Sequence, residues 1–190
     1  NYRKDTYSSS SFSLLCNCGV NFDKLEKDGI PYDIFAEYLT TSGLVLNDEL
    51  TWFCYHGSYD FAYLLRLLTN SPLPESEADF TEELSVYFPN LYDVKILTRG
   101  NERLPLGLNR LANYLDVFRK GSTHQAGSDS ILTLDIYFKL LDLSYIEKDL
   151  QDEAKNVIFG IGVGADDNET LSYTKIGNCL GYDYMNSSAR

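Results

Sequence analysis

The chain has 190 residues, of which 44% are hydrophobic and 14% aromatic, and its formal net charge is -12. This length and apolar content suffice for one folded domain with a substantial core, which excludes a disordered chain. The acidic charge excludes a protein that grips nucleic acid through a basic face. It leaves room for an enzyme that holds a short strand end through metal ions and base stacking.

The sequence contains neither a bilayer-crossing run of about 20 apolar residues nor a basic and apolar signal segment at its start. We therefore expect a soluble, intracellular protein with no membrane partner. The chain begins at Asn1 rather than at Met, as expected of a processed, engineered or partial chain. Its four cysteines lack the paired spacings of a zinc site, so we expect reduced thiols, with Cys54 in the core.

The first 55 residues predict two helices followed by a short strand. Apolar residues recur at loosely helical spacing over residues 12–27. A second helix is expected to take Pro31 as its first residue and to stop at Gly43. The aromatic segment 50–55 is typical of a strand that is buried on at least one side.

The segment after this strand predicts a tight turn and a helix. The strand ends at His56-Gly57, and residues 59–68 have helical periodicity, with Ser58 as the expected N-cap. Asp60 then stands in the first turn of the helix. Tyr59 and Phe61 could stack on a base, although core packing is the favoured interpretation of both rings.

The remaining pattern alternates helices with one more strand. In chain order we expect a helix over residues 75–87, a strand over 90–96, a helix over 106–115 and a long helix over 127–143. The apolar positions of the long helix include Ile131, Leu134, Ile136, Phe138 and Leu141. Such alternation indicates an α/β fold, but two strands are too few to support this many helices.

The run His124-Gln125-Ala126-Gly127-Ser128-Asp129 opens the long helix. Five residues of a helix turn by about 500°, which would leave His124 and Asp129 about 140° apart around the axis. His124 is therefore expected in the turn before the helix, and Gly127 permits a backbone that swings the imidazole back over the helix entrance. Simple helix capping by Ser128 or Asp129 is the favoured alternative for this segment alone.

Asp60 and Asp129 considered together favour a metal site over simple helix capping. Asp60 alone also has a plain explanation as a helix-start acid. Two acids at two separate helix starts suit Mg²⁺, which prefers oxygen ligands and leaves positions for water and substrate phosphate. With two such ions, one can activate a water and the other can stabilise the leaving oxygen, while a histidine accepts the water's proton. The residues predict phosphodiester hydrolysis.

Several longer segments resemble one known family, the Caf/Pop deadenylases, which are poly(A)-specific ribonuclease subunits of the Ccr-Not complex. The resemblance extends over about residues 5–164. Its main motifs are His124-Gln125-Ala126-Gly127-Ser128-Asp129-Ser130, the strand-turn-helix segment 53–64 and the segment Phe88-Pro89-Asn90-Leu91-Tyr92-Asp93-Val94-Lys95. Residues 40–45 and 67–74 add to the match.

This resemblance implies an RNase H-like exonuclease fold that uses four acids and one histidine around two divalent metal ions, Mg²⁺ or Mn²⁺. By motif match, Asp60 and Asp129 would be the third and fourth acids and His124 the general base. The family's first two acids form an Asp-x-Glu pair on a strand upstream of the matching segments, and no acid of this chain stands in their place. Asp5, Asp23, Glu26 and Asp28 lie elsewhere.

The resemblance therefore implies an N-terminally truncated version of the fold, with few strands and a mostly helical remainder. Residues 1–164 would be a partial deadenylase domain and residues 165–190 a polar tail. The implied function is 3′–5′ shortening of messenger RNA poly(A) tails in the cytoplasm and nucleus. The implied partners are poly(A) RNA, the Ccr-Not scaffold and a second deadenylase subunit, and we expect this chain alone to be inactive. Two alternatives are a truncated pseudonuclease that binds proteins within Ccr-Not and an acidic α/β domain without a catalytic role.

Overall fold

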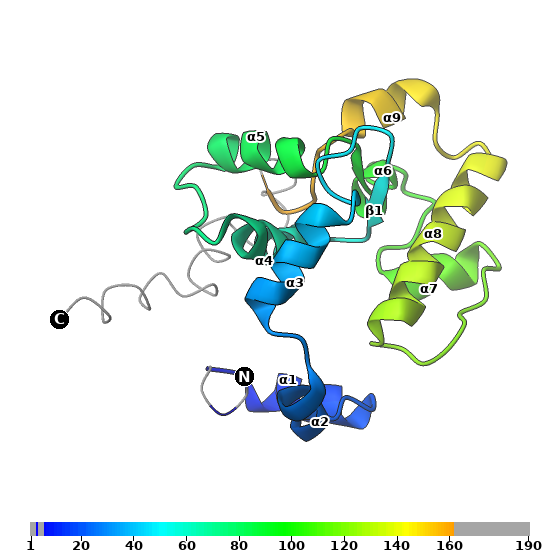
Figure 1. Cartoon of the computed structure of the whole chain (residues 1–190). Helices are drawn as coiled ribbons and strands as arrows, with labels where there is room; N and C mark the ends of the chain where they lie inside the picture. The colour runs from blue at the N-terminus through cyan, green and yellow to red at the C-terminus, as the bar shows by residue number, and fades with distance from the viewer. Residues whose placement is uncertain (1–2, 4–5, 162–190) are drawn as a thin grey trace.

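The computed structural model describes residue 3 and residues 6–161 of the chain. The elements in this part, shown in Figure 1, are α1 (Ser9–Asn17), α2 (Phe22–Asp28), α3 (Tyr32–Thr41), β1 (Trp52–Cys54), α4 (Ser58–Thr69), α5 (Glu77–Tyr87), β2 (Leu91–Asp93), α6 (Val94–Leu97), α7 (Leu108–Tyr114), α8 (Ala126–Asp142) and α9 (Lys148–Ala154). The predicted α/β class is confirmed. The polar tail over residues 165–190 and Asp5 lie outside the described residues.

β1 and β2 form a small parallel sheet, in which Trp52 pairs with Leu91 and Cys54 with Asp93. Both strands are shorter than the sequence predicts. The predicted strand over residues 90–96 was wrong in its second half, because the Asp93 side chain accepts the Lys95 N–H and thereby caps the short helix α6. α4 and α5 form the crossover that two parallel strands require.

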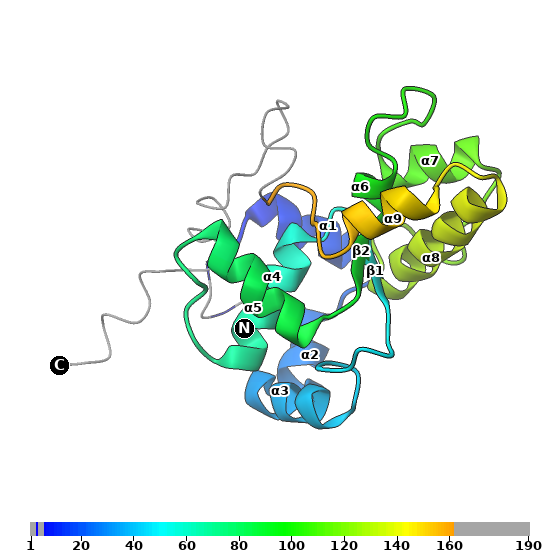
Figure 2. The same cartoon turned by 90° about the horizontal axis from the view of Figure 1, so that it is seen from above.

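Helices cover both faces of this sheet, as Figure 2 shows from above. Trp52 and Cys54 pack against one buried cluster, which is built mainly from α3, α4 and α5. Phe53 and Tyr55 pack against a second cluster, built mainly from α6, α7, α8 and α9. Successive side chains of a strand point to opposite faces, so the three residues of β1 divide the core into two layers.

The two edges of the sheet differ. At the outer edge of β2, Asn156 imitates a neighbouring strand: its N–H donates to the Leu91 carbonyl over 2.8 Å, and its Oδ1 accepts the Leu91 N–H over 2.9 Å. Asn156 has a φ of 60°, a left-handed conformation that asparagine tolerates well. On the side of β1 that faces β2, the Trp52 N–H donates to the Asn90 carbonyl. The outer edge of β1 is the side that points away from β2. Among the described residues β1 has no second strand neighbour.

The N-terminal region contains three helices rather than the predicted two. The helical conformation is interrupted between α1 and α2 at Gly19, whose φ is 93°. The Asn21 side chain then caps the N-terminus of α2. Neither α1 nor α2 contains a buried residue. Pro31 is the N-cap of α3 rather than its first helical residue, and α3 packs on α4. The N-terminal pair is therefore attached to the domain through a small contact area.

The start of α4 differs from the prediction in one respect. The N-cap is Gly57, without a side-chain cap, and Ser58 lies inside the helix. Ser58 is fully buried, and its Oγ has no hydrogen-bond partner within the described residues. A Cβ on Gly57 would lie 2.6 Å from Cys54 Sγ and 2.8 Å from Cys54 Cβ. Only glycine therefore allows the turn to pass this close to β1.

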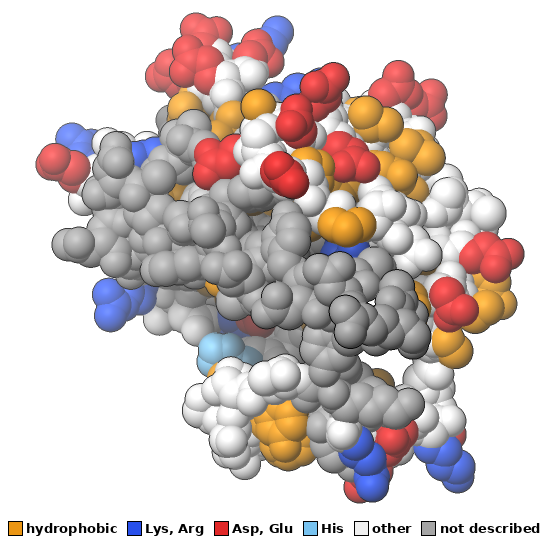
Figure 3. Space-filling model, turned by 90° about the vertical axis from the view of Figure 1, so that its left-hand side faces the viewer, with side chains coloured by type: hydrophobic (Ala, Val, Ile, Leu, Met, Phe, Trp, Pro, Cys, Tyr) orange, Lys and Arg blue, Asp and Glu red, His pale blue; other side chains and the backbone are white. Residues whose placement is uncertain are grey.

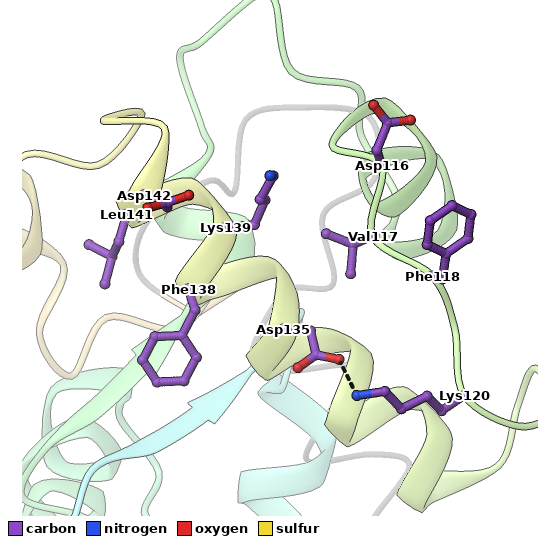
Figure 4. Close-up of a pocket in the computed structure, with 9 residues that line it drawn as sticks. All are labelled: Asp116, Val117, Phe118, Lys120, Asp135, Phe138, Lys139, Leu141 and Asp142. Carbon is purple, nitrogen blue, oxygen red and sulfur yellow. Dashed lines mark hydrogen bonds and ion pairs between the residues drawn. The ribbon is translucent and has the colours of Figure 1, made fainter.

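The long helix α8 confirms the predicted helix over residues 127–143, and only some of the apolar positions noted in its sequence are buried. The buried apolar residues are Leu132, Ile136, Tyr137 and Leu140. Ile131, Leu134 and Phe138 are exposed instead. Figure 4 shows Phe138 and Leu141 on α8 and Val117 and Phe118 on the preceding segment, and all four residues line one hollow. Both stripes have helical spacing, so periodicity alone could not choose between them.

Within the described residues, no helix combines the length and the apolar character that crossing a membrane requires. Acidic side chains dominate the upper part of the molecular face in Figure 3, with few basic groups between them. The net charge of the chain is therefore visible on its outer surface.

Candidate catalytic cleft

The predicted site residues Asp60, His124 and Asp129 line one cleft of about 1110 Å³. Its walls come from β1 and the following turn, the start of α4, the start of α7, the loop before α8 and the first turns of α8. Residues that are 69 positions apart in sequence, Asp60 and Asp129, therefore meet in one space. This proximity was predicted from residue chemistry and from the resemblance.

Asp60 stands in the first turn of α4, as predicted, and its side chain is exposed. The positive end of the helix dipole favours a carboxylate at this position. The Asp60 charge also reaches Cys54, where it adds to burial and to Asp93 in raising the pKa of the thiol, with burial as the largest cause. Phe61 next to it is 3% exposed and belongs to the core, as the packing interpretation predicted.

His124 lies in the turn before α8, as predicted, and is exposed. The left-handed backbone is at His124 itself, whose φ is 61°. Gly127 instead lies inside the helix, with open space where a Cβ would stand, so the role predicted for it was wrong. The helix begins after Gln125, whose side-chain amide donates to the Cys18 carbonyl over 3.0 Å.

Asp129 lies in the first turn of α8 and is half-buried. Its Oδ1 accepts a hydrogen bond from Arg119 Nη1 at 2.5 Å. The same nitrogen donates to Ser128 Oγ over 2.9 Å, and Nη2 donates to Asn109 Oδ1 over 2.6 Å. Arg119 was not among the predicted site residues. Its signal in the sequence is weak, because a basic residue ten positions before an acid has no defined spacing.

Asp93 is a second residue that sequence reasoning did not select. Its side chain is fully buried and accepts four backbone N–H groups, those of His56, Gly57, Lys95 and Phe159, over 2.8 to 3.2 Å. Burial raises the pKa of this carboxyl, while the four hydrogen bonds act in the opposite direction. Asp93 thereby fixes the turn that carries the chain from β1 to α4 and towards Asp60.

Lys95 also lines the cleft, although its side chain is only 5% exposed. Its Nζ lies 3.8 Å from the centroid of the Phe159 ring, a cation–π contact that compensates part of the cost of burying an ammonium group. Arg110 and Arg119 line the same cleft. The cleft is therefore lined by one lysine, two arginines and the carboxylates of Asp60 and Asp129, a more basic residue balance than that of the whole chain.

The predicted metal ligands do not form a complete site by themselves. Within residue 3 and residues 6–161, no three His, Cys, Asp or Glu side chains are grouped closely enough to hold one metal ion. Asp129 is engaged by Arg119. Asp23 and Glu26 are paired with Arg3 far along the chain from Asp60. The described residues therefore do not fit a resident metal ion without further donors.

The sequence and the fold match known proteins. Residues 45–136 match the model of the CAF1 family ribonuclease. The chain is 44% identical over 163 residues to "Probable CCR4-associated factor 1 homolog 10" of Arabidopsis thaliana, covering 86% of this chain and 58% of that protein. It is 39% identical over 162 residues to "Poly(A) ribonuclease pop2" of Schizosaccharomyces pombe, covering 85% and 48%. The chain thus spans about half of the length of these relatives.

Two solved structures have the same architecture. The structure of S. pombe Pop2p in its Mg²⁺- and Mn²⁺-bound form matches with a TM-score of 0.75 and 37% identity, over 84% of this chain and 63% of that chain. A yeast structure of the NOT1 MIF4G domain co-crystallized with CAF1 matches with a TM-score of 0.68 and 30% identity, over 84% and 63%. The predicted RNase H-like fold is confirmed. By sequence and by fold, this chain resembles the CAF1 ribonuclease family, whose model its residues 45–136 match.

Proposed function

We propose that this chain acts in a metal-dependent 3′–5′ exoribonuclease that shortens the poly(A) tails of messenger RNA. The observation that carries the proposal is the meeting of Asp60, His124 and Asp129 in one cleft. The poly(A) ribonuclease activity named for the S. pombe relative supports the substrate class. The Mg²⁺ and Mn²⁺ of the Pop2p structure support two divalent ions of this kind as cofactors.

In this proposal His124 is the general base. It is exposed just before the N-terminus of α8, where its imidazole can accept the proton of an attacking water. The carboxylates of Asp60 and Asp129 are oxygen ligands of the type that hard divalent ions prefer. Two carboxylates are too few for two ions, so we expect the 190-residue chain to be inactive unless further donors are supplied.

The charge of the cleft also supports an anionic substrate. Lys95, Arg110 and Arg119 line it, while the chain as a whole carries a net charge of -12. A local excess of cations attracts phosphate groups over roughly a Debye length, about 8 Å at physiological salt. An RNA backbone would therefore be drawn to this cleft in preference to the acidic outer surface.

We also propose that the protein works as a Ccr-Not subunit in the cytoplasm and nucleus, with the scaffold and a second deadenylase subunit as partners. The relative co-crystallized with the NOT1 MIF4G domain supports the scaffold contact. One observation favours a second candidate, a pseudonuclease that serves as a binding module. Phe118 and Phe138, which line a separate hollow, are 84% and 57% exposed, as suits a protein-binding surface.

The test compares the 190-residue chain with the longest natural product of its gene on 5′-labelled oligo(A) RNA with Mg²⁺ or Mn²⁺. We expect stepwise 3′ shortening by the longer product only. Asp60→Asn and Asp129→Asn should abolish it, and His124→Ala should slow it by about 10²-fold or more, the usual contribution of a proton-transfer group. Asp135→Asn is the matched control, because Asp135 is a half-buried α8 acid that pairs with Lys120 and does not line the cleft.

Undiminished shortening by Asp60→Asn or Asp129→Asn would contradict the site. Shortening by the 190-residue chain would contradict our view that its donors are too few. If the longest product is inactive but binds a NOT1 MIF4G domain in calorimetry, the binding-module candidate is the correct one.

A further inference from the structure

The guanidinium of Arg119 joins three separate parts of the cleft wall. It belongs to the loop before α8, and it donates to Asn109 on α7 and to Ser128 and Asp129 on α8. The Arg119 side chain is only 14% exposed. A half-buried cation with three hydrogen bonds loses most of its rotational freedom. The residue is therefore a fixed part of the wall.

Only arginine can make this set of contacts. Its planar guanidinium presents donors in a rigid fork, so Nη1 can serve two acceptors on α8 while Nη2 serves the amide oxygen on α7. A lysine at the same place would carry one compact charge on a flexible stem. It could keep the ion pair with Asp129 but could not hold Asn109 in the same geometry.

The neighbouring residue Lys120 offers an internal comparison. It pairs with Asp135 of α8 over 3.1 Å, as Figure 4 shows, but its side chain is 69% exposed. An exposed pair of this kind contributes little to stability. Two consecutive basic residues of the loop thus contact the same helix. Of the two, Arg119 is largely shielded from solvent and Lys120 is exposed.

The loop that Arg119 fastens is the one that carries His124. Gly121 lies against the start of α8, where a Cβ would be 3.4 Å from Ser128 Cβ and its φ is 90°. His124 follows three residues later, with its own left-handed backbone. A shift of the loop away from α7 and α8 would therefore move His124 relative to Asp129.

We propose that Arg119 is a positioning residue, which orients the Asp129 carboxylate and holds the His124 loop so that both side chains face one cleft. The inference rests on the proposed ribonuclease function for its purpose, but the positions of the two residues can be measured without RNA or metal. Arg119 would act through Asp129 and the loop rather than on the substrate itself.

The experiment is nuclear magnetic resonance on the isotope-labelled 190-residue chain. In Arg119→Ala, the backbone amide signals of His124 and Asp129 should shift, and the His124 order parameter should fall from a rigid value of about 0.85 to below about 0.6. Added ethylguanidinium should return both signals towards their wild-type positions, because it can refill the space and the hydrogen bonds. Lys120→Ala is the matched control and should leave both signals in place.

Asn109→Ala removes one of the three acceptors and should give a smaller shift in the same direction. If Arg119→Ala fails to fold, the His124 and Asp129 signals of Asn109→Ala test the proposal instead. Unchanged His124 and Asp129 signals in a folded variant would overturn the proposal. So would changes spread evenly over the whole chain that ethylguanidinium does not reverse, because these would indicate a purely structural role. Failure of the RNA assay alone would overturn the proposed function and leave these signals unaffected.

Discussion

Replacing Asp93 by asparagine tests how the turn between β1 and α4 is held. Each Asp93 oxygen accepts two backbone N–H groups: Oδ1 those of His56 and Lys95, and Oδ2 those of Gly57 and Phe159. Asparagine keeps one acceptor oxygen and replaces the other by an NH₂ group. Two of the four N–H groups would then face a donor.

An unsatisfied buried donor costs about 1–3 kcal/mol. Two such groups, partly offset because asparagine no longer buries an ionisable carboxyl, predict a loss of about 2–4 kcal/mol in the free energy of unfolding of Asp93→Asn at neutral pH. This is a large share of the total stability of a typical domain, about 5–15 kcal/mol.

The pH dependence of that loss follows from the pKa of Asp93. Burial raises this pKa in the folded state above the unfolded value of about 3.9. The folded state then binds the proton more tightly, so the contribution of Asp93 to stability is largest below the unfolded pKa. It falls as pH rises towards the folded pKa. The stability gap between wild type and Asp93→Asn should therefore be widest in acid and should narrow with rising pH.

The measurement is urea unfolding of both proteins, followed by circular dichroism at several pH values. Asp135→Asn, which removes a half-buried carboxylate paired with an exposed lysine, is the control and should change stability by less than about 1 kcal/mol. A gap that widens as pH rises would show that the four hydrogen bonds outweigh burial. A loss as small as that of the control would refute the role assigned to Asp93.

Three further changes test other contacts. Gly57→Ala should lower the free energy of unfolding by about 1–3 kcal/mol, because its Cβ would overlap Cys54; an unchanged melting temperature would contradict this packing. Asn156→Ala should cost about 2 kcal/mol, since the Leu91 N–H loses its acceptor, and Asn156→Asp, which keeps that oxygen, should recover part of the loss in the same urea assay. In labelling with a disulfide reagent near neutral pH, exposed Cys16 should react before Cys54, whose pKa is raised by burial, and equal rates would contradict that burial.

The sequence predicted those parts of the site that local chemistry determines. A strand, a glycine turn and a helix place Asp60 in a first helical turn, and the angular spacing on a helix places His124 before α8. It could not predict the acceptors of Asp93 or the partners of Arg119. These contacts join residues that no periodicity relates, such as Asp93 and Phe159.

The buried face of α8 could not be chosen from the sequence, for a related reason. Ile131, Leu134 and Phe138 recur at helical spacings of three and four residues, and the buried Leu132, Ile136 and Leu140 recur at a helical spacing of four. Which stripe faces inward is decided by the position of β1 and α7, with which α8 is in contact. That position is a property of the fold rather than of the segment.

The edge of β2 that Asn156 occupies limits the side on which the sheet can accept another strand. An unpaired strand edge is a template for another strand. In the part of the chain that the structure describes, β2 is blocked by the backbone and side chain of Asn156, so a further strand can add only beside β1. Two molecules could pair through their β1 edges, but each would then have no edge left. Among the described residues such pairing would use the last open strand edge, so it would stop at two copies.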